Sequence, residues 1–299
     1  MPITKKSSAA DTMRVQEALA AVYYDLSIDG DSGPETQRQA SNFAFEHGLR
    51  VDASSELVIG DDVIAALAKA PKWARLIDVS KWNGDGGKYG ALPDFAKVKA
   101  GGICGAYIKA GGADGGLYTD VAFNANWRNA RNAGLLRGAY FFHTFSDANT
   151  AEEQAEKFYK IVGGHTPGDL PPCLDVEDRA SPSMAPDKAA AHVRRTLERM
   201  RELSGVTPLL YTSASALGYR KIDTKTNGLE AYPLWVPRYP KPPYKIVDLA
   251  KSIPQCYPNK KAWSIWQLGN SANMRGVINN VDRNFFQGTE EELRAFFKV

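Results

Sequence analysis

Residues 170–177 read Leu-Pro-Pro-Cys-Leu-Asp-Val-Glu, and this stretch decides the fold. A short apolar run leads into two acids separated by one residue, as in a buried strand of a parallel sheet. Because side chains alternate between the faces of a strand, Asp175 and Glu177 point the same way, about 7 Å apart along the chain. Leu174 and Val176 point to the opposite face, where helices pack. The carboxyl end of such a strand is where β/α barrels place their chemistry.

The sequence on both sides of this stretch alternates between strand-like and helix-like runs. Strands are predicted at 76–79, 103–109, 138–142, 172–176, 209–212, 234–237 and 264–268. Helices are predicted at 92–100, 119–133, 147–162 and 186–203, and the long helical patterns stop after about residue 213. This alternation predicts an α/β fold over residues 71–299, an irregular TIM-like β/α barrel with incomplete helices in its second half.

A small domain of three short helices is predicted to precede the barrel, over residues 1–70. Apolar residues repeat at helical spacing from Val15, and a third helix is expected near residue 61. Ser32 and Glu35 form a capping-box pattern that predicts the start of the second helix. Residues 70–72 read Ala-Pro-Lys, a short and stiff junction between the two domains.

The charge of the chain is unevenly distributed. Residues 1–70 carry 6 Lys and Arg against 11 Asp and Glu, whereas residues 71–299 carry 31 against 23. A basic second domain suits an anionic polymer, although a solvated surface of mixed charge explains it equally well. No basic helix with interleaved aromatic residues occurs, so nucleic acid is not an expected partner.

The cysteines and histidines give no sign of a cofactor or metal. Cys104, Cys173 and Cys256 are odd in number and have no short spacing, which predicts neither a disulfide framework nor a metal site. Cys104 and Cys173 lie in apolar runs and are predicted to be buried free thiols. The four histidines stand singly, without the spacing of metal ligands.

The acids at the predicted strand ends have the chemistry of glycoside cleavage. Two close carboxyl groups resist ionising together, so the pKa of one of them should rise. The group that keeps its proton near neutral pH can act as a general acid, which the leaving oxygen needs as positive charge develops on a sugar. Asp78 ends the first predicted strand and Asp282 follows Val281, so both are expected at the same barrel mouth as Asp175 and Glu177.

Aromatic residues gather at the same predicted edge. Sugar rings present flat C–H faces that stack on aromatic rings, and Tyr and Trp add a polar group at a wet edge. The cluster contains Trp82, Tyr140, Phe142, Tyr211, Trp235, Tyr239 and Trp266. Tyr140, Tyr211 and Trp266 are expected as cleft walls because each lies in the last part of a predicted strand. The predicted substrate-binding set is Tyr140, Phe142, Tyr211, Trp235, Trp266, Gln267 and Trp82.

An ordered set of motifs over residues 75–288 resembles glycoside hydrolase family 25, the lysozymes that act as N-acetylmuramidases. The motifs are Asp78-Val79-Ser80 with Trp82, Tyr107-Ile108-Lys109-Ala110, Ala133-Gly134-Leu135 with Gly138-Ala139-Tyr140, Leu170-Pro171, Asp175-Val176-Glu177, Leu234-Trp235, Trp266-Gln267, and Val281-Asp282 with Asn284. The resemblance implies cleavage of the β-1,4 bond between N-acetylmuramic acid and N-acetylglucosamine in peptidoglycan.

The resemblance also implies roles for the four acids. Glu177 would be the general acid, and Asp175 would orient the 2-acetamido group of the substrate or stabilise the charge formed when that group attacks. Asp78 and Asp282 would shape the site and its protonation. A direct carboxylate nucleophile would explain the family's retaining outcome equally well.

Two stretches depart from the family pattern near the expected cleft. Residues 111–115 read Gly-Gly-Ala-Asp-Gly, where many relatives carry an acidic Thr-Glu-Gly turn. Phe141 and Phe142 follow Tyr140, where His-Phe is commoner. The Asp-x-Glu motif is intact, so an active enzyme is expected.

The first domain resembles the small helical peptidoglycan-binding domains that accompany many wall hydrolases. The matching residues are Val15-Gln16, Leu19, Ile28-Asp29-Gly30, Gly33, Thr36, Phe43 and Gly48-Leu49. No signal peptide or membrane-spanning run of roughly 18 apolar residues is found. A protein made in the cytoplasm and delivered to the wall or periplasm by a separate system is therefore expected. A monomer is the favoured oligomeric state. Holin-type release of a phage endolysin is favoured, with effector secretion as the alternative.

Three other functions stay open from the sequence. A non-catalytic wall- or chitin-binding protein could retain the barrel, but the acid at position 177 is present. A chitinase-type hydrolase also uses an Asp-x-Glu ending, usually after a longer Asp-rich run than residues 171–174 provide. A structural phage or secretion component could use the barrel for docking alone.

Overall fold

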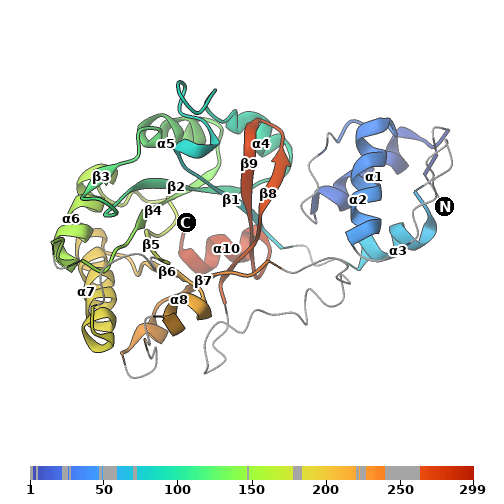
Figure 1. The fold of residues 1–299 in the computed structure, drawn as a ribbon. Coiled ribbons are helices and arrows are strands. Elements are labelled where there is room, and N and C mark those ends of the chain that lie inside the picture. The colour runs from blue at the N-terminus through green and yellow to red at the C-terminus, as the bar shows by residue number, and fades with distance from the viewer. Residues whose placement is uncertain are drawn as a thin grey trace.

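A closed β-barrel forms the centre of the larger part of the chain (Figure 1). The computed structural model describes residues 3–4, 6–21, 26, 28–46, 49, 59–69, 73–146, 148–177, 184–219, 222, 227–239 and 263–299. The barrel strands are β1 (Arg75–Val79), β2 (Gly105–Gly112), β4 (Leu136–Phe142), β5 (Cys173–Val176), β6 (Leu209–Thr212), β7 (Leu234–Pro237), β8 (Ile265–Met274) and β9 (Val277–Phe286). Neighbouring strands are parallel from β1 to β8, and β9 closes the barrel antiparallel to both β8 and β1.

The predicted irregular β/α barrel is confirmed, and all seven predicted strands are present. β9 and the two-residue β3 (Tyr118–Thr119) were not predicted. β9 begins Val-Ile-Asn-Asn-Val-Asp, and three consecutive exposed residues follow its first position, so it has neither an apolar run nor regular alternation. β9 therefore forms because it pairs with β1 and β8, and its local sequence alone does not predict a strand.

β2 continues three residues beyond its predicted end. A register shift between Lys109 and Gly111 lets the strand turn toward β3, which pairs with Gly111 and Gly112. A Cβ atom at Gly111 would stand 2.1 Å from the carbonyl oxygen of Tyr118. This close approach of two backbones explains Gly111, the first of the glycines that depart from the family pattern.

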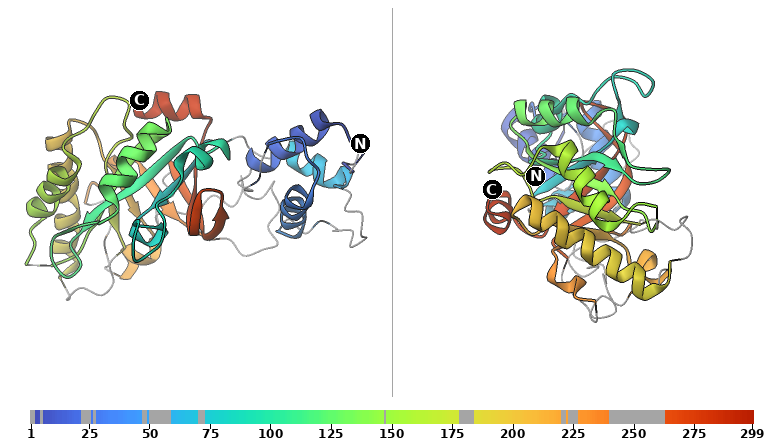
Figure 2. Two further views of the ribbon diagram at one scale, coloured as in Figure 1. Left: turned by 90° about the horizontal axis from the view of Figure 1, so that it is seen from above. Right: turned by 90° about the vertical axis from the view of Figure 1, so that its left-hand side faces the viewer.

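Helices on the outside of the barrel follow the predicted order (Figure 2). They are α4 (Phe95–Ala100), α5 (Phe123–Asn132), α6 (Ala151–Val162) and α7 (Pro186–Ser204). The first three begin three or four residues later than predicted. The side chains of Asp94 and Thr150 cap α4 and α6, and residues 118–119 join the sheet before α5.

The second half of the barrel carries shorter helical elements, as predicted. They are α8 (Ala214–Tyr219), the 3-10 turn η2 (Leu229–Ala231) and, after β9, α10 (Glu290–Phe297). In the described residues none of these exceeds eight residues, whereas α7 has 19.

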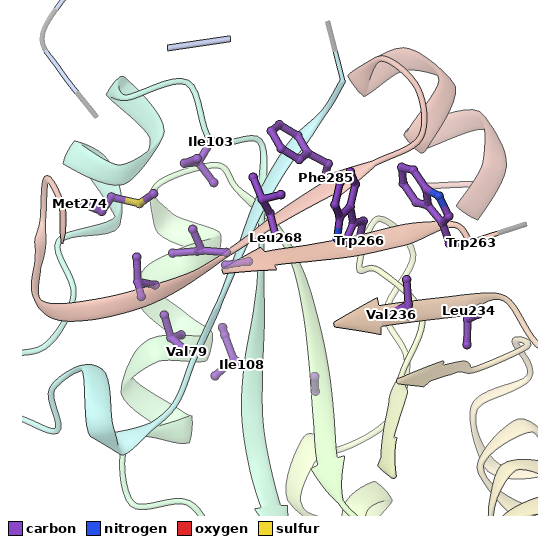
Figure 3. Packing of buried hydrophobic residues seen from close by; sticks show 14 of the residues in the cluster. Val79, Ile103, Ile108, Leu234, Val236, Trp263, Trp266, Leu268, Met274 and Phe285 are labelled. Atoms are coloured by element: carbon purple, nitrogen blue, oxygen red, sulfur yellow. The ribbon is translucent and has the colours of Figure 1, made fainter. Parts of the chain in front are cut away.

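Buried side chains form one cluster inside the barrel and another around its outer face. The inner cluster includes Leu76, Tyr107, Cys173 and Trp235. The outer cluster joins Leu174 and Val176 to the covering helices, and Figure 3 shows its aromatic part on β8 and β9. Cys173 is buried as predicted, Cys104 is half-buried, and both are free thiols. Cys256 lies outside the described residues.

The N-terminal part contains the three expected helices, α1 (Ala9–Ala21), α2 (Pro34–Glu46) and α3 (Asp61–Ala68) (Figure 1). The Gln16 side chain organises them: its Nε2 donates to Asp29 Oδ1 and Thr36 Oγ1, and its Oε1 accepts from Gly30 N. The predicted capping box at Ser32 is wrong. Pro34 starts the helix, and Ser32 Oγ donates to the carbonyl of Thr4 instead.

The predicted junction at residues 70–72 lies outside the described residues, so the boundary at residue 70 stays a prediction. Among the helices described, none combines the length and apolarity needed to cross a membrane.

Candidate active site

The carboxyl end of β5 places Asp175 and Glu177 at the mouth of the barrel. Asp175 lies within the strand and is 6% exposed, and Glu177 follows the strand directly and is exposed. Leu174 and Val176 point outward into the helix-facing cluster, as the alternation of a strand requires. Both acids line one cleft, so the predicted shared direction of their side chains is confirmed.

The cleft has a volume of about 400 Å³ and lies at the carboxyl ends of the strands. Four acids line it together with aromatic, amide and basic side chains. The lining residues are Asp78, Ser80, Trp82, Lys109, Tyr140, Phe142, Asp175, Glu177, Tyr211, Trp235, Tyr239, Gln267 and Asp282. A space of this size, walled by aromatic rings and acids, suits a sugar ring.

Asp175 is buried and incompletely hydrogen-bonded. Burial raises its pKa well above the usual value, and the negative charge of Glu177 raises it further, while Lys109 acts in the opposite direction. Its Oδ1 atom is buried and has no hydrogen-bond partner among the described residues. A buried acceptor of this kind is costly unless a ligand supplies a donor. The site is therefore arranged to receive an N–H or O–H group at Asp175.

Asp78 and Asp282 form a second carboxyl pair, on β1 and β9. The two residues are paired in register across these strands, and each carboxyl group shifts the pKa of the other. Asp78 Oδ2 also accepts from Gln267 Nε2 at 3.0 Å and from Asn284 Nδ2 at 2.8 Å. These amide donors favour the ionised form of Asp78.

The environments of the two carboxyl groups in this second pair differ. Burial raises the pKa of Asp282 to about 9, and the neighbouring negative charge of Asp78 adds to the rise. Burial also raises the pKa of Asp78, but the hydrogen bonds from Asn284 and Gln267 oppose that rise. The arrangement therefore favours a proton on Asp282 over one on Asp78.

Aromatic and amide side chains connect the two pairs. Gln267 Oε1 accepts from the hydroxyl groups of Tyr211 at 2.9 Å and Tyr239 at 2.6 Å, which fixes the orientation of its amide toward Asp78. The indole Nε1 of Trp235 donates to Asn284 Oδ1 at 2.8 Å. The cleft floor is thus held by hydrogen bonds before any ligand arrives.

The structure brings together ten of the eleven predicted site residues. Glu177, Asp175, Asp78, Asp282, Tyr140, Phe142, Tyr211, Trp235, Gln267 and Trp82 all line the cleft. The prediction that Trp266 forms a cleft wall is wrong. Its side chain is fully buried in the outer cluster, where it contacts Trp263 edge to face (Figure 3). Adjacent residues of a strand face opposite ways, so Gln267 facing inward forces Trp266 outward.

Sequence reasoning missed Lys109 and Ser80 as lining residues. Lys109 belongs to β2, and its Nζ lies 4.8 Å from the ring centroid of Phe142. Its place near the end of a predicted strand was the available signal. Phe142 lines the cleft, whereas Phe141 is buried in the outer cluster.

A closed β/α barrel with a pair of neighbouring carboxyl groups and aromatic walls at the carboxyl ends of its strands is typical of a glycoside hydrolase. The sequence profile described as "Glycosyl hydrolases family 25" matches residues 77–277. Lysozyme M1 from Streptomyces globisporus is 31% identical over 226 residues, covering 73% of this chain and 69% of that protein. The chain therefore belongs to glycosyl hydrolase family 25, and it is an enzyme of the lysozyme type.

Solved structures agree with this assignment. The bacterial lysozyme from Streptomyces coelicolor superposes with a TM-score of 0.62 at 29% identity, covering 75% of this chain and 97% of that chain. A family 25 glycosyl hydrolase from Bacillus anthracis has a TM-score of 0.60 at 23% identity, over 75% of this chain and 93% of that chain, which supports the fold alone.

Proposed function

We propose that the chain hydrolyses the β-1,4 bond between N-acetylmuramic acid and N-acetylglucosamine in peptidoglycan, with Glu177 as the general acid. The observation that carries this proposal is the pair of carboxyl groups at the end of β5, both of which line the cleft. Glu177 is the more exposed of the two and can reach the glycosidic oxygen of a bound polymer.

Substrate binding moves a proton from Asp175 to Glu177, the general acid. In the free enzyme, burial favours the protonated form of Asp175. When the N–H of a 2-acetamido group donates to the unpartnered Oδ1 of Asp175, the ionised form of that carboxyl becomes more favourable. The new negative charge raises the pKa of Glu177, so the proton passes to Glu177. Glu177 then donates it to the leaving oxygen.

Two routes then lead from the cleaved bond to a retained product. In the first, the acetamido oxygen attacks the anomeric carbon while Asp175 accepts the N–H and stabilises the positive charge. In the second, a carboxylate attacks directly. On both routes, water deprotonated by Glu177 then attacks the anomeric carbon and displaces the acetamido oxygen or the carboxylate, which gives the retained product. Asp78 contributes a negative charge at the cleft floor on either route, and Asp282 holds the proton that keeps this charge single.

The product identifies the reaction. Purified peptidoglycan is digested with the enzyme, the new reducing ends are reduced with borohydride, and the fragments are analysed by mass spectrometry. Reduced muramic acid at the new ends is expected. Reduced glucosamine at those ends, or equal lysis by wild type and Glu177→Gln, would contradict the proposal. Comparison with chitin oligosaccharides separates a muramidase from a chitinase-type enzyme, and the absence of any fragments would indicate a binding protein.

The three-helix domain is proposed to bind the wall, on the basis of its resemblance to peptidoglycan-binding domains. The full chain and a variant beginning at residue 71 are compared by co-sedimentation with insoluble cell wall and by cleavage of soluble wall fragments. Loss of sedimentation with unchanged cleavage of soluble fragments is expected. Equal sedimentation of both proteins would show that the barrel alone provides the affinity.

A further inference from the structure

A cationic aromatic patch lies at one edge of the cleft, in the segment that follows β1. It consists of Lys81, Trp82, Lys88 and Tyr89. The rings of Trp82 and Tyr89 meet edge to face with centroids 4.5 Å apart. Lys81 Nζ lies 5.0 Å from the Trp82 ring centroid, and Lys88 Nζ lies 5.0 Å from the Tyr89 ring centroid. Trp82 lines the cleft, although 57% of it is exposed.

Hydrogen bonds between side chains and the backbone hold the patch in place. Asp85 Oδ1 accepts from the backbone N–H of Tyr89 at 2.9 Å, and Asn279 Nδ2 on β9 donates to the carbonyl of Trp82 at 2.8 Å. Asn83 Nδ2 donates to the carbonyl of Asn280 at 2.8 Å, which ties the 3-10 turn η1 (Lys81–Asn83) to the same strand. An exposed tryptophan on so well-anchored a segment loses little conformational freedom when a ligand binds.

The two ammonium groups are available to a ligand. In the part of the chain that the structure describes, neither Lys81 nor Lys88 has a carboxylate within the 4.0 Å of an ion pair. Both are instead near aromatic faces, which attract cations without neutralising them. A ligand carboxylate can therefore approach either lysine without displacing a protein carboxylate.

The cleft beside the patch has the opposite charge. Its two carboxyl pairs repel any carboxylate that enters with the substrate. Peptidoglycan carries such carboxylates on the muramic acid residue, either on the lactyl group or on the stem peptide attached to it. These groups must lie outside the acidic centre while the sugar rings occupy it, and the patch offers positive charge at that position.

We propose that the cationic aromatic patch binds a carboxylate of the muramic acid substituent and so makes the enzyme prefer carboxylate-bearing glycan. Lys81 and Lys88 pair with the carboxylate, and the exposed ring of Trp82 stacks on the adjacent apolar surface of the substrate. The proposed role depends on the muramidase activity proposed above.

The test compares wild type with the double variant Lys81→Gln/Lys88→Gln on matched soluble glycans. The first glycan carries stem peptides with free carboxylates. The second has been treated with an amidase, which removes the peptides and leaves the lactyl carboxylate. Each glycan is also prepared in a neutral form, with its carboxylates converted to N-methylamides. For wild type, kcat/KM is expected to be about three- to tenfold higher on one carboxylate form than on its methylamide. The glycan that shows this preference identifies the carboxylate bound.

The double variant is expected to lose this preference and to cleave the methylamide glycans as fast as wild type. A double variant that keeps the preference would overturn the proposal, and so would one that slows cleavage of charged and neutral glycans equally. The matched control is Lys157→Gln/Lys160→Gln on α6, which removes the same charge away from the cleft lining. If this control variant also lost the preference, the preference would arise from the net charge of the protein, and the proposed role of the patch would be wrong.

Failure of the proposed function would look different. Wild type would then release no fragments with muramic acid ends from any of the glycans. A wild type that releases these fragments but shows no preference for either carboxylate form would refute the patch alone.

Discussion

The two carboxyl pairs in the cleft differ in how completely the protein satisfies them. Asp78 receives hydrogen bonds from Gln267 and Asn284 and shares a proton with Asp282. Asp175 is equally buried, yet its Oδ1 has no partner among the described residues, and its neighbour Glu177 is exposed. The first pair is complete without substrate, whereas Asp175 in the second pair keeps an open acceptor atom for it.

This difference separates positioning from proton transfer. A carboxylate held by fixed amide donors has a constant charge and supports the cleft floor. A carboxyl group with an open acceptor changes its proton affinity when a ligand donor arrives, and this change can drive a proton to its neighbour. We therefore expect changes in the second pair to affect catalysis most, and changes in the first pair to affect stability as well.

The largest effect is expected for Glu177→Gln. The amide keeps the size of the side chain but cannot donate a proton to the leaving oxygen, so kcat should fall about 10³-fold. Because Glu177 is exposed, the melting temperature should stay at the wild-type value. Release of reducing ends from purified peptidoglycan measures the rate, and thermal unfolding provides the control. A decrease in kcat of less than tenfold would show that another residue is the general acid.

Asp175→Asn is expected to lower kcat about 10²-fold. The amide can still contact an acetamido group, but it cannot take up a negative charge or pass its proton to Glu177. The fold should tolerate the change, since it removes a buried group that ionises only at a cost in stability. Single-turnover rates on soluble glycan fragments measure the effect. A variant that loses binding with unchanged kcat would make Asp175 a binding group alone.

Asp78→Asn is expected to reduce both activity and stability. The amide oxygen can still accept from Gln267 and Asn284, but it carries no negative charge, so both buried hydrogen bonds weaken and Asp282 loses its carboxyl partner. We expect a loss of about 2 kcal/mol in the free energy of unfolding and a fall in kcat of about tenfold. Denaturant unfolding and steady-state kinetics measure the two effects. Wild-type stability in this variant would show that the hydrogen bonds around Asp78 contribute little.

Asp282→Asn is expected to change how stability depends on pH. The pKa of Asp282 is raised from its ordinary 3.8 to about 9 in the folded chain, so the folded state binds more protons than the unfolded state between these values. Wild type should therefore lose stability, relative to the variant, as pH rises from 5 to 9. Melting temperatures of both proteins across this range measure the difference. Parallel curves would show that Asp282 ionises normally.

Tyr211→Phe is expected to have the smallest effect. Gln267 Oε1 loses one of its two phenol donors but keeps Tyr239, so the amide still faces Asp78. The expected loss is about 0.5–1.5 kcal/mol in the free energy of unfolding, with a change in kcat of less than about threefold. The double variant Tyr211→Phe/Tyr239→Phe tests the reasoning. It should lose more than the sum of the single variants, because only then is the amide free to turn.

The sequence predicted the pair that acts on substrate better than the pair that supports it. Asp175 and Glu177 are two residues apart on one strand, so the alternation of side chains is enough to place them together. Asp78 and Asp282 were expected at the same barrel mouth. Their direct pairing depends on the antiparallel register of β9 with β1, and β9 has no local pattern that predicts a strand.

The errors at Trp266 and Ser32 have the same origin. Trp266 and Gln267 are adjacent on one strand, so only one of them can face the cleft, although both were predicted to bind substrate. Trp266 packs with Trp263 and Phe285 on the outside of the barrel, so Gln267 is the residue that faces the cleft (Figure 3). Ser32 has a capping sequence, but a tertiary contact with Thr4 takes its hydroxyl group.

Short-range periodicity was enough to predict seven strands in order, the barrel class and the acids at the barrel mouth. Long-range packing fixes which carboxyl groups have hydrogen-bond partners, which aromatic rings face the cleft, and where Lys81 and Lys88 lie relative to Trp82 and Tyr89. Burial, hydrogen-bond partners and charge separation are set between residues far apart in the chain, and local patterns carry no information on those distances.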